Sequence, residues 1–215
     1  MRSMFDQQLK TLNEEMLYMG GLCEDTSQQT IEALMSGDVK KAHALNNMMS
    51  QLTQQERSIE NICLKLLMQQ QPVARDLRTI SSSLKMVTDM ERIGIQACEI
   101  AEIIAVGNVV RATDKVDFQE LSNEVSHMVQ MAMMAYDKKD MNLADEVIKY
   151  DDVVDKLFCD IRGDLIKQLK DDTNDAECFI DMLMIDKYFE RIGDHAVNIA
   201  SWVKFSITGE IQIVD

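Results

Sequence analysis

The sequence predicts an all-α protein, built as a tandem repeat of two antiparallel three-helix bundles with six long helices. The chain of 215 residues contains one proline and eight glycines, so it carries little of the turn chemistry that a β-rich fold needs. Its apolar residues recur at alternating steps of three and four, which is the spacing of one helix face. The same pattern returns in the second half of the chain, as expected of an internal duplication.

The first helix is expected to start near Phe5 and to end near Gly37, because glycine is a common stop at a helix C-terminus. One face of this helix carries only apolar and small residues, so it should be buried. These residues are Phe5, Leu9, Leu12, Met16, Met19, Cys23, Thr26, Thr30 and Ala33.

A second helix is expected from Asp38, a favourable N-cap residue. Its apolar face is formed by Ala42, Leu45, Met49, Leu52, Ile59, Cys63 and Leu66. The pair Gln71-Pro72 should interrupt the chain, because the residue before a proline avoids the helical conformation. A third helix is then expected from Asp76, and its apolar face is formed by Leu77, Ile80, Leu84 and Val87.

The second half repeats this pattern at an offset of 102 residues for the first two helices and 99 for the third. Identity is visible at one place, where Glu91–Gly94 and Glu190–Gly193 both read ERIG. We therefore expect one three-helix repeat over residues 1–108 and a second over 109–215. Only the stretch 207–214, where apolar residues alternate, is expected to depart from helix.

Composition limits the partners and the compartment. The 22 basic and 37 acidic residues give a net charge of -15, which would repel a nucleic acid. The five cysteines form no CxxC pair and are odd in number, which favours reduced thiols and a cytoplasmic location. No segment reaches 18 consecutive apolar residues, so we expect membrane association only peripherally, through partner proteins.

Acidic residues in the second repeat occupy positions that are mostly apolar in the first. They are Asp151, Asp155, Asp186, Glu190 and Asp194. Their counterparts in the first repeat are, in the same order, Met49, Thr53, Val87, Glu91 and Ile95. Because the substitution into an apolar face occurs in one repeat and not in the other, it indicates a local function of the second repeat.

These acids predict a metal site. Asp151 and Asp155 are four residues apart, as are Glu190 and Asp194, so each pair lies on one helix face. If the two helices are antiparallel neighbours, the carboxylates converge, and such a cluster is costly unless a cation neutralises it. A divalent or trivalent ion is expected, with magnesium, manganese, calcium or iron favoured over zinc because the ligands are oxygens.

Two other interpretations of this region remain open. The acids could line an exposed groove or form surface ion pairs with Lys187, Arg191 and Lys156. His195 adjoins Asp194, but adjacent residues diverge by about 100° around a helix. We therefore expect His195 to face solvent or to form a hydrogen bond between helices.

Catalytic motifs are absent from the sequence. A ferritin-like di-iron enzyme needs two inward Glu-x-x-His motifs, and only Glu124-x-x-His127 fits that spacing. No GxSxG, Walker loop or HExxH motif occurs either. We expect no catalytic residues and no enzymatic activity. A metal-dependent phosphohydrolase and a purely structural helical adaptor are the alternatives.

Two segments carry a family resemblance. The segment from Phe189 to Ala200 reads FERIGDHAVNIA and resembles the signature ERIGDHAVNIA of the PhoU family, with a partial copy at Met90–Gly94. The segment from Gln71 to Arg78 reads QPVARDLR and resembles the QPxxxDLR start of the third helix in that family. The resemblance extends over nearly the whole chain, including repeat number and helix order.

The resemblance implies both a metal site and a function. PhoU-like proteins hold metal ions through (E/D)xxxD motifs, which here match Asp151-x-x-x-Asp155 and Glu190-x-x-x-Asp194 and have no full match in the first half. The family role is to repress the phosphate-starvation response, by coupling the phosphate ABC transporter to a sensor histidine kinase. On this basis we expect a non-enzymatic regulator of phosphate uptake and signalling, present as a homodimer.

Overall fold

The computed structural model describes residues 2–69, 72–109, 116–171 and 175–210, and it is helical throughout, with no strand in these ranges. The helices are α1 Arg2–Ser36, α2 Val39–Ala44, the short 3-10 helix η1 Leu45–Asn47, α3 Met48–Gln69, α4 Ala74–Val106, α5 Gln119–Lys138, α6 Met141–Asp171 and α7 Ala176–Thr208. The predicted all-α fold is confirmed.

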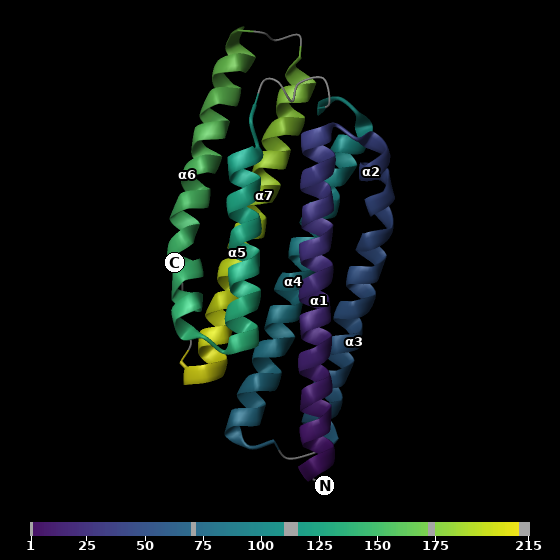
Figure 1. Ribbon diagram of the computed structural model, residues 1–215, viewed down its shortest axis with the longest axis vertical. Coiled ribbons are helices and arrows are strands. Elements are labelled where there is room, and N and C mark those ends of the chain that lie inside the picture. The colour runs from purple at the N-terminus through teal and green to yellow at the C-terminus, as the bar shows by residue number, and fades with distance from the viewer. Residues whose placement is uncertain (1, 70–71, 110–115, 172–174, 211–215) are drawn as a thin grey trace.

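The long helices run along one common axis and form two bundles (Figure 1). Helices α1, α3 and α4 pack together in the first bundle, and α5, α6 and α7 pack together in the second. Helices α4 and α7 pack along each other and join the two bundles, with a smaller contact between α1 and α5. The expected boundary between 1–108 and 109–215 lies in the connection between α4 and α5 and stays a prediction.

One continuous hydrophobic core extends through both bundles. Most of the predicted apolar faces are buried in it, and two residues on the buried face of α1 donate to backbone carbonyls of α4. Cys23 Sγ donates to the carbonyl of Met90 at 2.9 Å, and Thr30 Oγ1 donates to that of Ala97 at 3.1 Å. Small side chains on α1 thus allow close packing against α4.

Leu77, and Leu183 as the counterpart of Leu84 at the offset of 99 residues, were expected in the core but are exposed. Leu77 lies in the first turn of α4, at one end of its bundle. Leu183 lies on α7 in a different setting, because α5 has 20 residues whereas its counterpart α1 has 35. The shorter α5 does not extend along the first turns of α7, as Figure 1 shows.

Two predictions about the second and third helices need correction. The Asp38 cap is confirmed, since its carboxylate accepts from the amides of Lys40 and Lys41, but the helix that follows is interrupted by η1. The interruption contains two consecutive asparagines, whose side chains compete with the helical backbone. The third helix begins at Ala74 rather than at Asp76, directly after the extended Val73.

The C-terminal boundary also differs from expectation. Helix α7 includes Ile207 and Thr208 and ends at Gly209, whose φ of 81° lies in the left-handed region that favours glycine. The departure from helix expected over 207–214 is therefore wrong at its start. Residues 211–215 lie outside the described part of the chain.

A glycine in each ERIG segment lets the neighbouring helix approach closely. A Cβ added at Gly94 would lie 2.5 Å from Cδ1 of Leu52, and one added at Gly193 would lie 3.3 Å from Cγ1 of Val154. Leu52 and Val154 are counterparts at the offset of 102 residues. The two repeats therefore share one packing geometry between their second and third helices.

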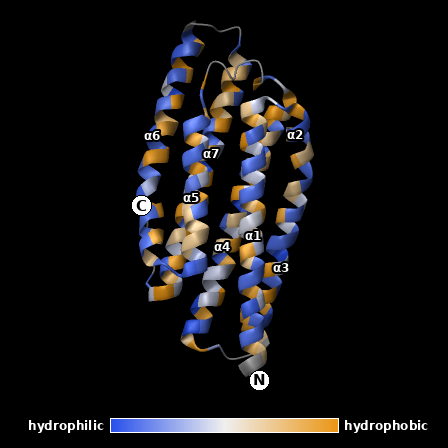
Figure 2. Cartoon of the chain, viewed as in Figure 1, coloured by the Kyte–Doolittle hydropathy of each residue, from blue (hydrophilic) through white to orange (hydrophobic). Residues whose placement is uncertain are grey.

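None of the helices in the described ranges is long and apolar enough to cross a membrane. Figure 2 shows hydrophobic and hydrophilic residues interleaved along every long helix, as expected of helices with one buried face.

Candidate metal centre in the second repeat

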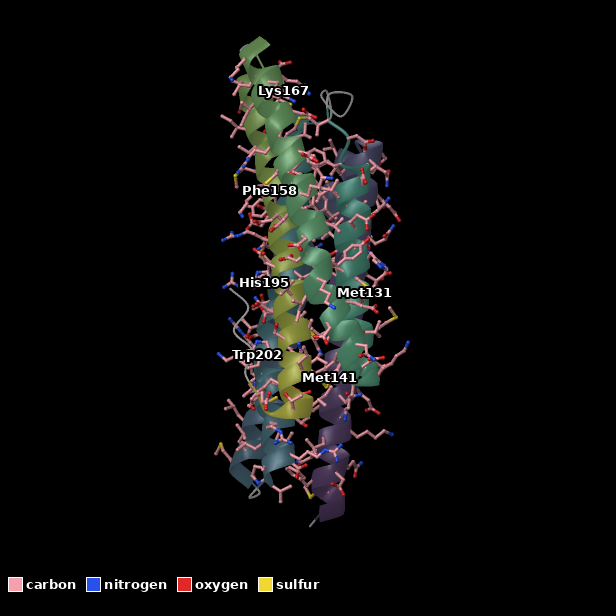
Figure 3. All side chains as sticks on the ribbon, turned by 90° about the vertical axis from the view of Figure 1, so that its left-hand side faces the viewer. Met131, Met141, Phe158, Lys167, His195 and Trp202 are labelled. Atoms are coloured by element: carbon pink, nitrogen blue, oxygen red, sulfur yellow. The ribbon has the colours of Figure 1, made fainter. Side chains whose placement is uncertain are left out.

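The five predicted acids lie on two neighbouring helices. Asp151 and Asp155 belong to α6, whereas Asp186, Glu190 and Asp194 belong to α7, which packs against α6 in the opposite direction. Phe158 and His195, which are labelled in Figure 3, lie close in sequence to the acids of α6 and α7 respectively. The predicted antiparallel arrangement of these two helices is confirmed.

The first repeat shows how these positions meet. Thr53 and Glu91 stand at the positions of Asp155 and Glu190, and the Thr53 hydroxyl donates to Glu91 at 2.8 Å. A hollow of about 600 Å³ adjoins this contact, and its lining includes Met49 and Arg57 but no carboxylate. The first repeat therefore places a hydroxyl-to-carboxylate hydrogen bond at these positions, with Glu56 and Glu60 as the acids near Glu91, whereas the second repeat places acids at the positions themselves.

Four of the acids stand near enough to influence one another's ionisation. The pKa of Asp151 is raised to about 6, chiefly by burial, with smaller contributions from the charges of Asp155, Asp194, the adjacent Asp152 and Glu190. Each of these groups opposes the ionisation of Asp151, which requires that they stand close to it. Burial also raises the pKa of Asp194, with Glu190 as the second cause. Full ionisation of these acids in the folded protein is therefore unfavourable.

Asp186 is the least solvated of the five. Its side chain is 0% exposed, and neither carboxylate oxygen has a hydrogen-bond partner. Burial raises its pKa to about 8, an effect that Arg162 opposes and Glu190 reinforces. An unpaired buried carboxylate is unfavourable unless it is protonated or meets a cation. The environment of Asp186 therefore favours either protonation of its carboxyl group or binding of a cation beside it.

Glu190 already has such a partner. Lys187 forms an ion pair with it on the same helix, and the Lys187 ammonium also lies 5.3 Å from the centre of the Phe158 ring. The ion-pair interpretation of the sequence is thus confirmed for Lys187. It does not extend to Lys156 and Arg191, which form no ion pair with any residue that the structure describes.

The acids provide suitable ligands without forming a complete coordination shell. Across the described ranges, no three His, Cys, Asp or Glu side chains are positioned to hold a metal ion as they stand. The donor set nevertheless fits a hard cation, because it consists of carboxylate oxygens from two rigid helices. Coordination requires side-chain rotation and release of Glu190 from Lys187.

His195 lies outside this cluster of ligands and bonds across the molecule. Its Nδ1 donates to Oδ1 of Asp89 on α4 at 2.9 Å, and Asn198 donates to the same oxygen at 3.1 Å. Asp89 is thus the acceptor that joins α7 to α4. The expectation of a helix-to-helix hydrogen bond for His195 is confirmed.

Sequence reasoning missed Asp89, although the offset of 99 residues contains a signal for it. The counterparts of Asp89 and Asn198 are Tyr188 and Glu99, and the Tyr188 hydroxyl donates to Glu99 at 3.2 Å. Each pair joins α4 to α7, so the two repeats are related by approximate two-fold symmetry. Polar residues at equivalent positions of the two third helices point to this contact.

Together, fold and site define the class: a protein of two three-helix repeats with an acidic helix pair in one of them. The chain belongs to the PhoU family, since the model of the PhoU domain matches residues 16–104 and 118–203. This result confirms the family resemblance seen in the sequence, with one match in each repeat.

Relatives match over nearly their full length. The chain is 33% identical over 211 residues to a phosphate-specific transport system accessory protein PhoU homolog from Clostridium acetobutylicum, covering 97% of this chain and 96% of that protein. It is 32% identical to the protein of the same description from Pseudomonas aeruginosa, covering 95% of this chain and 86% of that protein.

Solved structures show the same fold. The crystal structure of PhoU from Pseudomonas aeruginosa matches with a TM-score of 0.91 and 31% identity, covering 96% of this chain and 100% of that chain. The phosphate transport system regulatory protein PhoU from Streptococcus pneumoniae matches with a TM-score of 0.89 at 23% identity, covering 98% of this chain and 100% of that chain. The second match concerns the fold alone.

Proposed function

We propose that this protein regulates inorganic phosphate uptake and represses the phosphate-starvation response when phosphate is plentiful. The observation that carries this proposal is its similarity over nearly the full chain to proteins described as phosphate-specific transport system accessory proteins. In this role the protein couples the phosphate ABC transporter to a sensor histidine kinase in the cytoplasm. The role is one of binding, without catalysis.

The shape of the molecule suits such a role. Helices of 31 to 35 residues, such as α1, α4, α6 and α7, offer long faces for partner proteins. A net charge of -15 favours partners with basic surfaces. We include a homodimer in this proposal.

Metal binding is the second part of the proposal. Asp151, Asp155, Glu190 and Asp194 would hold a divalent or trivalent ion between α6 and α7, with Asp186 as a further ligand on α7. The raised pKa of Asp151 and the orphaned carboxylate of Asp186 support this assignment. A bound cation would neutralise the acids and fix the separation of the two helices.

A deletion strain tests the regulatory role. Without this protein, a reporter of the phosphate-starvation response should stay active in phosphate-rich medium, and the intact gene supplied in trans should silence it. The ion pair of Lys167 and Asp164 is exposed, so a Lys167→Gln, Asp164→Asn variant offers a complementing control. Unchanged reporter expression in the deletion strain would count against the proposed function.

A further inference from the structure

A cavity of about 640 Å³ lies between the two repeats, away from the acidic cluster. Its walls come from the first half of α1, the start of α4, the end of α5 and the end of α7, which lie toward the same end of the molecule (Figure 1). Ser206 on its wall is twelve residues from Asp194, or about 18 Å along α7. Its size is that of a small-molecule site.

The charge of this cavity is opposite to that of the protein. Four cationic residues line it, against two acidic ones. The cations are Lys10, Arg75, Arg78 and Lys139, and the acids are Asp76 and Asp137. The lining therefore carries a net charge of about two positive units, within a chain whose net charge is -15. Such a local excess of positive charge attracts anions of small size.

Most of these cations are available to a ligand. Lys10 stands 3.6 Å from Glu14 in an exposed ion pair of the kind that contributes little. Arg75, Arg78 and Lys139 make no ion pair within the described ranges. Two arginines offer planar groups of donors that match the oxygens of phosphate.

Buried polar atoms on the cavity wall point to the same site. Arg78 Nε is buried without a hydrogen-bond partner. The Ser83 side chain is 1% exposed and lines the cavity together with Arg78, and its hydroxyl lies beside the phenol of Tyr136. Buried polar atoms are normally paired, so the unpaired guanidinium nitrogen of Arg78 is a donor available to a ligand in the cavity.

The rest of the lining is apolar. Leu12 and Met86 are buried, and Tyr136 is half-buried beside Ser83. Burial raises the pKa of the Tyr136 phenol, so this group stays neutral and adds no negative charge. The cavity thus combines cationic donors with an apolar wall and one aromatic ring, which accommodates an organic group as well as a phosphate.

We propose that this cavity binds a small dianion that carries a phosphate group, either inorganic phosphate or a phosphate monoester. Arg75, Arg78 and Lys139 contact the phosphate oxygens, and Ser83 donates from the floor of the cavity. Leu12, Met86 and Tyr136 surround any organic portion. The ligand contacts α1, α4, α5 and α7 together, so its binding stabilises the packing of one repeat on the other.

Isothermal titration calorimetry of the full chain tests the proposal, with inorganic phosphate and phenyl phosphate as the two probes at constant ionic strength. Both Arg75→Gln and Arg78→Gln should raise the dissociation constant by about tenfold, as expected on loss of a charge-assisted hydrogen bond. Arg75 is exposed, so its replacement leaves the core intact. Arg92→Gln, at an exposed position of the same helix, should leave binding unchanged.

One further control separates this cavity from the proposed metal centre. Asp151→Ala should retain phosphate binding, because Asp151 lies on α6, outside the cavity lining. Tighter binding of phenyl phosphate would identify a monoester as the ligand, and equal binding would identify inorganic phosphate. The proposal would be overturned by absence of binding of both probes, by loss of binding in Asp151→Ala, or by equal effects of Arg92→Gln and Arg78→Gln.

Discussion

Gly94 occupies a position where the backbone of α4 meets Leu52 of α3. Alanine there would place a Cβ 2.5 Å from Leu52 Cδ1, so side chain and helix must shift. We expect Gly94→Ala to lower the free energy of unfolding by about 1–3 kcal/mol, the range for overpacked cores. A Cβ added at Gly193 would lie 3.3 Å from Val154 Cγ1, so Gly193→Ala should lower the free energy of unfolding by less than Gly94→Ala does.

Gly21 provides the matched control for this prediction. It lies within α1 with no atom within 4 Å of an added Cβ. Gly21→Ala should raise the free energy of unfolding by up to about 1 kcal/mol, because alanine is the better helix former. Urea denaturation of Gly94→Ala, Gly193→Ala and Gly21→Ala measures the free energy of unfolding of each variant. Equal effects of alanine at Gly21 and Gly94 would contradict the packing argument.

Asp186 should make the metal-free protein sensitive to pH. Its folded-state pKa of about 8 lies above the ordinary value of 3.8, so the folded state binds the proton more tightly than the unfolded state. Below about pH 4 Asp186 does not lower the free energy of unfolding. As the pH rises toward 8, this free energy falls, because the folded state must either keep the proton or bury a charge. Replacement by valine, the residue at the equivalent Val87, removes this penalty.

Asp186→Val in the presence of a chelator should therefore raise the melting temperature at pH 8 by at least about 3 °C, the shift that about 1 kcal/mol produces in a protein of this size. At pH 4 the gain should largely disappear. Thermal melts at both pH values measure the difference. A lower melting temperature for the valine variant at pH 8 would show that Asp186 has a stabilising partner.

The sequence was informative about individual acids but not about their partners. Repeat alignment placed Asp186 on a buried face, and the structure confirms its burial. The sequence alone did not show whether Glu190 would lie next to a metal ion or next to Lys187. A lysine three residues away on the same helix can reach the carboxylate that would bind the ion. Sequence reasoning also missed Asp89, whose contact depends on how α4 crosses α7.

At the scale of helices, the contact between α4 and α7 is held by Asp89. Its Oδ1 accepts from His195 and from Asn198, whereas the equivalent Tyr188 makes one bond, to Glu99. Charged hydrogen bonds between partly buried groups contribute about 1.5–3 kcal/mol each. The association of the two repeats should therefore depend more on Asp89 than on Tyr188.

A double-mutant cycle of Asp89→Asn and His195→Gln measures this contact. Each single change should lower the free energy of unfolding by about 1–2 kcal/mol, with a coupling energy above about 0.5 kcal/mol, because the residues bond directly. Tyr188→Phe serves as the comparison and should cost less. Additive effects of the two changes would mean that the residues act independently.

Helix lengths were less predictable than helix order. The offset of 102 residues relates the apolar faces of the two repeats without fixing helix lengths, and α5, which begins only at Gln119, leaves Leu183 on α7 exposed. Periodicity reports which face of a helix is apolar, not how far its neighbour extends. The short η1 was missed for a similar reason, since the apolar spacing continues through Leu45.

At the scale of the whole molecule, the two repeats share a fold and differ in chemistry. The close contacts of Gly94 and Gly193 are equivalent, but the positions around them hold a Thr53–Glu91 hydrogen bond in one repeat and clustered carboxylates in the other. Affinity of an oxygen site for a hard cation rises with the number of anionic ligands. Metal binding should therefore be confined to the second repeat.

Elemental analysis of metal content tests this central claim most directly. The wild-type chain and the variants Asp151→Ala, Glu190→Ala and Glu91→Ala are loaded with manganese or magnesium, desalted and analysed. Asp151→Ala and Glu190→Ala should each retain less than about a tenth of the wild-type metal, because removal of one carboxylate ligand weakens an oxygen site strongly. Glu91→Ala should retain all of it. Equal loss from Glu91→Ala and Glu190→Ala, or a metal-free wild-type chain, would contradict the account.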